Sequence, residues 1–160
     1  MVQKDMEEAI AWLRKHGITS VLLELPPGLM HTTIIREMLE DAGVEVWQSM
    51  EPVHGACDIN LHEAARAGVG AVLHIGHYPM IPSTPIPVYY LPLRKPFPVE
   101  SLETLALPDN IAIAAITQYV HLLPEVKKTL EEKGKKVFIA SGERTPVPVS
   151  YTHLTLPTKA

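Results

Sequence analysis

The chain has 160 residues, of which 46% are hydrophobic, enough to build the core of one ordinary domain or two small ones. Its formal net charge of −4 argues against direct nucleic-acid binding, which needs a basic surface, and its single cysteine excludes an internal disulfide framework. No apolar window is long enough to cross a bilayer, and the first residues are charged where a signal peptide would be apolar. We therefore expect a cytoplasmic protein with no membrane partner.

The first half of the sequence alternates short apolar strands with amphipathic helices. Helices are predicted over residues 5–15, 29–41 and 59–67, and strands over residues 20–25, 44–48, 71–75 and 86–91. Buried strands that alternate with helices favour a parallel sheet with helices on both faces. The predicted fold class is therefore α/β.

A proline-rich stretch at residues 92–108 separates this half from a second segment with the same order of elements. The second segment is predicted to contain strands over residues 111–117 and 136–140 and a helix over residues 121–133. We predict repeated small parallel-sheet units: a complete one in residues 1–95 and most of a second in residues 96–149. Residues 150–160 do not continue the pattern, and we interpret them as an artefactual, poorly ordered tail.

Unusual residues follow the ends of the first three predicted strands. Gly28 follows the first strand, Gly55 and Cys57 follow the second, and His77 follows the third. Ligands bind outside the carboxyl ends of parallel strands, so these loops are expected to share one rim. A cysteine just before a helix ionises more easily, and a thiolate can bind a metal or attack an electrophile. The ordinary alternative is a half-buried cysteine that packs as a small hydrophobic residue.

Several readings of Cys57 remain open on these residues alone. A zinc site could use His54, Cys57, His74 and His77, although His74 lies inside a predicted strand and need not face the same way as His77. Cys57 could also act as a nucleophile with His77 as its base, but no oxyanion-hole signature supports this. A non-catalytic α/β ligand-binding domain with a structural Cys57 is a third possibility. Dinucleotide and phosphate-loop motifs are missing from the sequence.

Four segments, in this order and spacing, resemble the diphthamide synthase family in its archaeal form. They are LPPGL at 25–29, GVEV at 43–46, EPVHGACD at 51–58 and GAVLHIGH at 70–77. The resemblance covers roughly residues 1–149, and its most specific part is the pairing of Gly-Ala-Cys-Asp with His-x-Gly-His. The sequence departs from the family pattern at Pro27, where the family has Glu, and at His54, where it has Tyr.

The resemblance implies three α/β units that each give one cysteine to a 4Fe–4S cluster, with Cys57 as the first ligand. It also implies that Gly28, Gly55 and His77 face the cofactor pocket, where S-adenosylmethionine binds. The family reaction is the first step of diphthamide biosynthesis. It transfers a 3-amino-3-carboxypropyl group from S-adenosylmethionine to a histidine of translation elongation factor 2.

The family enzyme is expected to be a homodimer with the elongation factor as its protein substrate. One thiolate cannot hold a four-iron cluster. The expectation is therefore that this chain is an N-terminal fragment of a transferase and is inactive alone.

Overall fold

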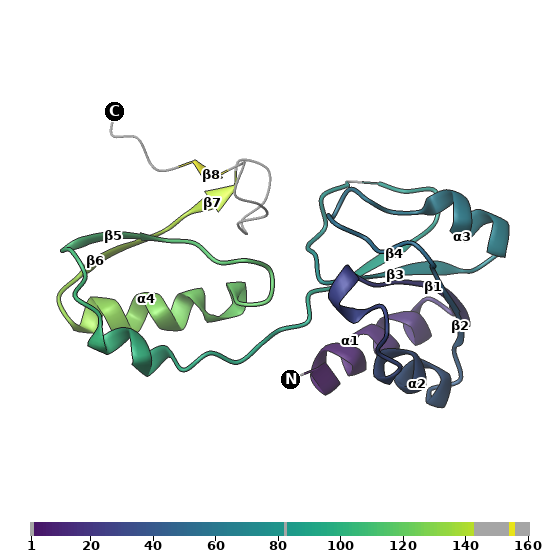
Figure 1. Ribbon diagram of the computed structural model, residues 1–160, viewed down its shortest axis with the longest axis horizontal. Helices are drawn as coiled ribbons and strands as arrows, with labels where there is room; N and C mark the ends of the chain where they lie inside the picture. Colours follow the sequence, from purple (N-terminus) through teal and green to yellow (C-terminus); the bar gives the residue numbers. More distant parts are fainter. Residues whose placement is uncertain (1, 82, 143–153, 156–160) are drawn as a thin grey trace. The chain divides into compact units, whose positions relative to one another are not determined.

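The computed structural model describes residues 2–81, 83–142 and 154–155 (Figure 1). Contacts along the chain divide it into two compact units, Met1–Leu93 and Arg94–Ala160. Most of the terminal segment at 150–160, for which we predicted a poorly ordered tail, lies outside the described residues.

The first unit is built on a four-stranded, fully parallel sheet with strand order β2-β1-β3-β4. Its strands are β1 (Ser20–Glu24), β2 (Glu45–Gln48), β3 (Ala71–Ile75) and β4 (Val88–Leu91). Its helices are α1 (Val2–Lys15), the 3-10 turn η1 (Pro27–Leu29), α2 (Ile34–Asp41) and α3 (Leu61–Ala67). The central strands β1 and β3 are almost completely buried, which agrees with their unbroken apolar sequences.

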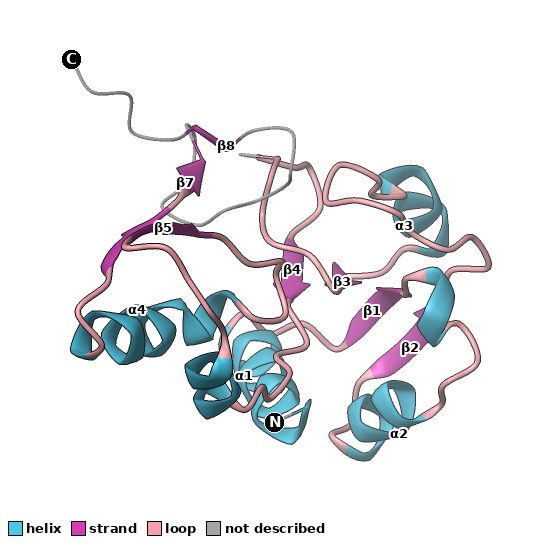
Figure 2. Ribbon diagram, turned by 60° about the vertical axis from the view of Figure 1, so that its left-hand side comes forward, coloured by secondary structure: helices cyan, strands magenta, loops and turns pink. Residues whose placement is uncertain are grey.

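Helices cover both faces of this sheet (Figure 2). Val21 and Leu23 of β1 belong to the larger core, which they share with residues of α1 and α2. Leu22, between them, points to the other face, where it packs with Ala64 of α3. Each leucine buried in this way stabilises the fold by about 1.5–3 kcal/mol. The alternation confirms the predicted α/β class, with a parallel sheet between helices.

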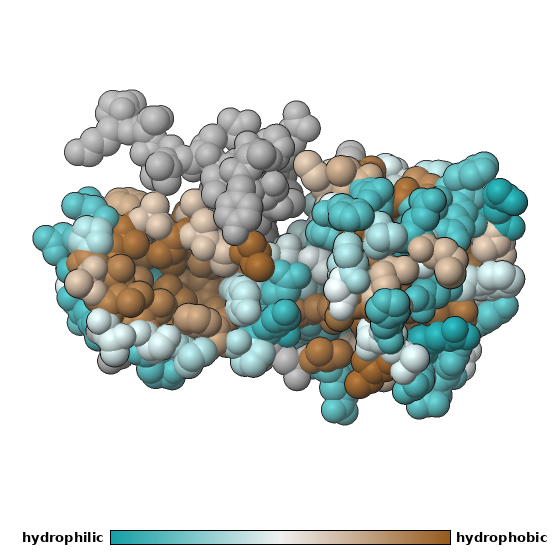
Figure 3. Space-filling model, viewed as in Figure 1, coloured by the Kyte–Doolittle hydropathy of each residue, from teal (hydrophilic) through white to brown (hydrophobic). Residues whose placement is uncertain are grey.

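The second unit contains a smaller parallel pair of strands. Its elements are η2 (Val99–Thr104), β5 (Asn110–Ile113), η3 (Val120–Leu122), α4 (Leu123–Glu132), β6 (Lys136–Ile139), β7 (Ser141–Gly142) and β8 (Leu154–Thr155). Leu130 of α4 and Val137 of β6 are buried. In contrast, Phe138 and Ile139 of β6 stay exposed, and Figure 3 shows apolar side chains gathered on the viewed face of this unit.

Most predicted elements are shorter in the structure than the sequence suggested, and three of them differ most. The predicted helix at 29–41 is a 3-10 turn followed by α2, which begins only at Ile34. The late start places Thr33 at the N-cap of α2, a position that threonine occupies more readily than alanine or the large aliphatic residues. The strand predicted at 111–117 ends at Ile113, and the helix predicted at 121–133 opens with a 3-10 turn. In the described part of the chain, no helix has both the length and the apolar character needed to cross a bilayer.

Candidate functional site

Three polar residues lie side by side at the carboxyl ends of adjacent strands. Glu24 is in register with His74, and His74 is in register with Tyr90, so the three form a row across β1, β3 and β4. We call them the polar row. Glu24 and His74 alternate with the larger-core residues Leu23 and Leu73, so the row faces α3. Both Glu24 and His74 are fully buried, which requires that their polar atoms find partners.

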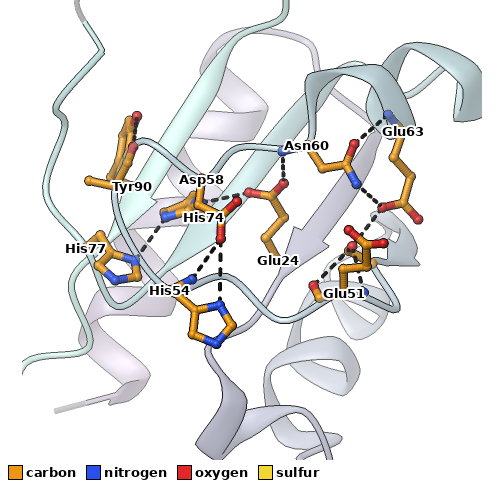
Figure 4. A network of polar contacts seen from close by, with 11 residues as sticks. Glu24, Glu51, His54, Asp58, Asn60, Glu63, His74, His77 and Tyr90 are labelled. Carbon is orange, nitrogen blue, oxygen red and sulfur yellow. Dashed lines mark hydrogen bonds and ion pairs between the residues drawn. The ribbon is translucent and has the colours of Figure 1, made fainter.

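A continuous hydrogen-bond chain runs through this row (Figure 4). The Glu24 Oε1 atom accepts a hydrogen bond from the backbone N–H of Asn60 at 2.6 Å. The Glu24 Oε2 atom lies 2.7 Å from His74 Nδ1. The second ring nitrogen, His74 Nε2, lies 2.9 Å from His77 Nδ1. The chain therefore extends from the start of α3, through the buried strands, to the loop after β3.

The loop that carries Cys57, residues 53–60, is fixed at several points; we call it the Cys57 loop. It begins where the Val53 N–H donates to the carbonyl of Leu25 at 3.0 Å. The Tyr90 hydroxyl donates to the Ala56 carbonyl at 3.2 Å. On the far side, the Asn60 N–H is held by Glu24. The polar row thus anchors the loop one residue before Cys57 and again three residues after it.

Cys57 itself is exposed. A Cβ built on Gly55 would lie 3.9 Å from the Cys57 Sγ atom, so the thiol lies beside the Gly55 backbone. The interpretation of Cys57 as a half-buried structural residue is therefore wrong. The expected helix start is also corrected, because α3 begins at Leu61 and Asn60 is its N-cap. The helix dipole consequently acts on Cys57 from farther away than the sequence suggested.

His77 is half-buried between His74 and the Cys57 loop. Burial lowers the pKa of His77, and the neighbouring His74 lowers it further. Asp58 and the backbone carbonyl of His54 act on the same pKa in the opposite direction, which locates the ring beside the Cys57 loop. The structure thus brings together His77 and the loop that contains Cys57 and Gly55.

The Tyr90 hydroxyl is also affected by charged groups of this site, namely Glu24 and Cys57. Burial is the largest cause that raises its pKa, and the charges of Glu24 and Cys57 add to the increase. Hydrogen bonding from the backbone of Ile81 and Met80 works against it. The raised pKa keeps the phenol protonated, so that its O–H can donate to the Ala56 carbonyl.

Gly28 lies in η1, directly after β1. A Cβ added there would meet no atom within 4 Å, so packing does not dictate a glycine at this position. Its predicted role in cofactor binding, like those of Gly55 and His77, stays a prediction.

The structure gives no support to the zinc hypothesis. The described residues, which include all four proposed ligands, form no group of three or more side chains that could hold a metal ion. His74 and His77 use their facing nitrogens to bond each other. The Cys57–His77 dyad is not formed either: within the described part of the chain, no hydrogen bond joins their side chains, and His77 Nδ1 is engaged by His74.

The sequence pointed to the loops but missed the polar row beneath them. Glu24 and Tyr90 were placed only within the strands predicted at residues 20–25 and 86–91. The available signal was a glutamate inside the otherwise apolar run Val21–Leu25, because an ionisable side chain in a buried strand is rare without a partner.

The comparisons with known families, sequences and structures agree with one another. The sequence model of a family described as "putative diphthamide synthesis protein" matches residues 25–158, a range that extends into the terminal segment. The chain is 31% identical over 143 residues to the 2-(3-amino-3-carboxypropyl)histidine synthase of Pyrococcus horikoshii. That alignment covers 85% of this chain but 42% of the relative, so the chain spans less than half of the relative's length.

Two solved structures of Dph2 from Pyrococcus horikoshii are similar to this chain. One has a TM-score of 0.73 at 29% identity and covers 82% of this chain and 41% of the other. The second, which is described with a 4Fe–4S cluster, has a TM-score of 0.71 at 30% identity over the same shares.

Proposed function

The chain belongs to the family of putative diphthamide synthesis proteins, and we propose on that premise that it is part of a transferase for the first step of diphthamide biosynthesis. The proposed reaction moves the 3-amino-3-carboxypropyl group of S-adenosylmethionine to a histidine of translation elongation factor 2. Support comes from the similarity to a 2-(3-amino-3-carboxypropyl)histidine synthase and from a similar structure described with a 4Fe–4S cluster. We further propose a cytoplasmic location and a homodimeric assembly.

This chain could supply one of the thiolate ligands of such a cluster, Cys57. Iron–sulfur clusters are held by cysteine thiolates, and Cys57 is exposed on an anchored loop at the carboxyl edge of the sheet. Because the sequence has a single cysteine, the remaining thiolates must come from residues that this chain does not contain. When bound, the cluster would supply the electron that cleaves S-adenosylmethionine.

The other rim residues of the chain would bind and orient S-adenosylmethionine. Gly55 leaves space beside the Cys57 thiol, His77 offers a ring nitrogen next to the same loop, and Gly28 contributes open backbone after β1. By itself the chain is proposed to be inactive, since one thiolate does not complete the ligand set.

The exposed and doubly anchored position of Cys57 is the observation that carries this proposal. It is tested with a chimaera in which this chain replaces the matching segment of the Pyrococcus horikoshii relative. After anaerobic reconstitution with iron and sulfide, we expect the chimaera to show the absorbance and spin-resonance signals of a 4Fe–4S cluster. The Cys57→Ser chimaera should lose most of the bound iron.

The matched control is Met50→Ala, which changes a side chain that is 84% exposed just before the Cys57 loop and should leave the iron content unchanged. Circular dichroism checks that all three chimaeras fold. A folded Cys57→Ser chimaera with undiminished cluster content would refute the assignment of Cys57 as a ligand.

A further inference from the structure

The strand β2 forms one edge of the four-stranded sheet (Figure 2). Within the described part of the chain, β2 pairs with β1 and with no other strand. The unpaired side of an edge strand presents backbone N–H and C=O groups that can bond to a further strand. The outer side of β2 is therefore a candidate surface for association.

The hydrogen bonds of β2 show which of its residues face this outer side. The Glu45 N–H donates to the carbonyl of Thr19, directly before β1, at 2.8 Å, and the Ser49 N–H donates to a carbonyl of β1 at 3.0 Å. Successive residues of a strand direct their backbone groups to opposite sides. The N–H and C=O groups of Val46 and Gln48 therefore point away from β1, toward the open edge.

A groove lies beside β2 on the face of the sheet that carries α3. Trp47 lines this groove, and its side chain is 50% exposed. Glu51 and Arg66 line it as well, and neither side chain has a salt-bridge partner among the residues that the structure describes. The groove thus combines an exposed tryptophan with unpaired charges of both signs.

The two charges lie toward opposite ends of the groove, because α3 runs antiparallel to the strands. The loop before α3 bonds to Glu24 at the carboxyl end of β1, and the Gly70 N–H, after α3, bonds to the Ser20 carbonyl at the amino end. Arg66, in the last turn of α3, therefore lies toward the amino end of the sheet, whereas Glu51 follows the carboxyl end of β2. A two-fold axis presents such a patch to itself, so opposite charges at its two ends are self-complementary.

We propose that two copies of this chain assemble through β2, with the two β2 strands paired antiparallel about a two-fold axis at Trp47. Val46 of each copy then forms a hydrogen-bonded pair with Gln48 of the other, and the two Trp47 side chains lie directly opposite each other on one face. The carboxyl end of one β2 comes level with the amino end of the other, which brings Glu51 of each copy level with Arg66 of the other. The inference rests on the homodimeric assembly proposed above and names its surface.

The register is tested by Trp47→Cys in a chain that also carries Cys57→Ser, so that the new cysteine is the only one. Opposite residues of this kind have Cα atoms about 4.5 Å apart, which a disulfide can bridge. After mild oxidation we expect a covalent dimer in non-reducing gel electrophoresis. The matched control is Glu45→Cys in the same chain, because the two copies of residue 45 would be offset by about 13 Å along the strands. Failure of Trp47→Cys to cross-link, or equal cross-linking of both variants, would overturn the proposed pairing.

Sedimentation equilibrium measures the association without any covalent bond. We expect the unmodified 160-residue chain to form dimers, and Trp47→Ala to weaken the dimer about tenfold or more, as buried interface tryptophans do. The matched control is Phe138→Ala, which truncates an aromatic side chain of the second unit that is 40% exposed and should leave the dimer unchanged. Circular dichroism checks that both variants fold. If Phe138→Ala weakened the dimer and Trp47→Ala did not, the proposal would fail.

Exchange of the two groove charges tests the self-complementarity. Arg66→Glu and Glu51→Arg should each weaken the dimer, because each places like charges opposite one another. The double variant Glu51→Arg/Arg66→Glu restores both pairs with reversed sign and should recover most of the affinity. A double variant that associates no better than the single variants would refute the pairing of the two grooves.

The chimaera described above separates this inference from the proposed function. A dimeric chimaera in which Trp47→Ala has no effect would refute the β2 surface and leave the homodimer standing. If the chimaera and the 160-residue chain were both monomeric, the homodimer and this inference would fail together. The cluster signal of the chimaera, measured in parallel, reports on the proposed transferase independently of both.

Discussion

Glu24 and His74 illustrate how two fully buried ionisable side chains are accommodated in a sheet. Both carboxylate oxygens and both ring nitrogens have hydrogen-bond partners, so neither residue leaves an unpaired polar atom in the core. Removing one partner of such a buried pair is expected to destabilise a protein by about 3–5 kcal/mol. The exposed pair Arg36–Glu40 on α2 differs, since surface pairs contribute only about 0–1 kcal/mol.

Tyr90→Phe should loosen the Cys57 loop at one of its two anchors. The change removes only the hydroxyl that donates to the Ala56 carbonyl and keeps the ring packed against His74. We expect a loss of about 1 kcal/mol in the free energy of unfolding and faster hydrogen exchange at the amide of Cys57. Urea unfolding and exchange NMR measure both. Unchanged exchange at Cys57 would show that the hydroxyl is not an anchor.

His77 should make stability depend on pH. Because burial and His74 lower its pKa in the folded chain, the unfolded chain takes up a proton at His77 at a pH where the folded chain does not. The free energy of unfolding should therefore fall as the pH drops below the ordinary imidazole value, until the folded-state pKa is reached. In His77→Gln this contribution should disappear.

The measurement is urea unfolding of both chains at several pH values between about 8 and 5, where histidines titrate. Glutamine can still hydrogen-bond to His74, so the comparison isolates the charge change of His77. A stability difference between the two chains that is constant over this range would contradict the prediction.

At the scale of elements, the short helix α3 depends on its N-cap. The Asn60 side chain accepts from the Glu63 N–H at 3.0 Å, and its amide donates to the Glu63 carboxylate at 3.1 Å. Asn60→Ala should lower the free energy of unfolding by about 1 kcal/mol, whereas Asn60→Ser, which keeps a capping oxygen, should restore most of it. Thermal unfolding of the three chains distinguishes these outcomes, and equal stability of all three would exclude the cap as a contributor.

Local patterns in the sequence were sufficient to locate most elements. The strands β1 and β3 are unbroken runs of buried apolar residues, so both were found within a residue of their observed ends. The start of α2 was missed because the 3-10 turn at Pro27–Leu29 has no apolar period that distinguishes it from the helix. The predicted α/β class required only the order of elements, which local patterns supply.

The candidate site was only partly predictable, because part of it depends on how the strands pair and not on local sequence patterns. Cys57 and His77 follow strand ends, so their common rim followed from the parallel sheet. The contact between Glu24 and His74 joins residues that are 50 positions apart and depends on the register of β1 against β3. Register is a property of packed strands, and no local pattern in this chain specified it.

At the scale of the whole molecule, the two units should differ in local stability. In the first, β1 and β3 are inner strands of a four-stranded sheet with helices on both faces. In the second, β5 and β6 pair only with each other among the described residues, and Phe138 and Ile139 remain exposed. We expect amide hydrogen exchange at β5 and β6 to be much faster than at β1 and β3, because two-stranded pairings are marginal in water.

Hydrogen exchange followed by mass spectrometry of peptides measures this difference in the unmodified chain. Leu23 and Ile113 lie in peptides suited to the comparison, one from each unit. Equal protection of the amides in the two sheets would contradict the prediction that the second unit is less stable.

The two anchors of the Cys57 loop have a thermodynamic consequence for the proposed binding of iron by Cys57. Tyr90 and Glu24 restrict the backbone on either side of the thiol as soon as the sheet forms. The conformational entropy of this segment is thus lost during folding, at a cost of about 1–2 kcal/mol for each ordered residue, and need not be lost again in the cluster binding proposed above. The sulfur is preorganised, so more of the intrinsic iron–thiolate bond energy would appear as affinity.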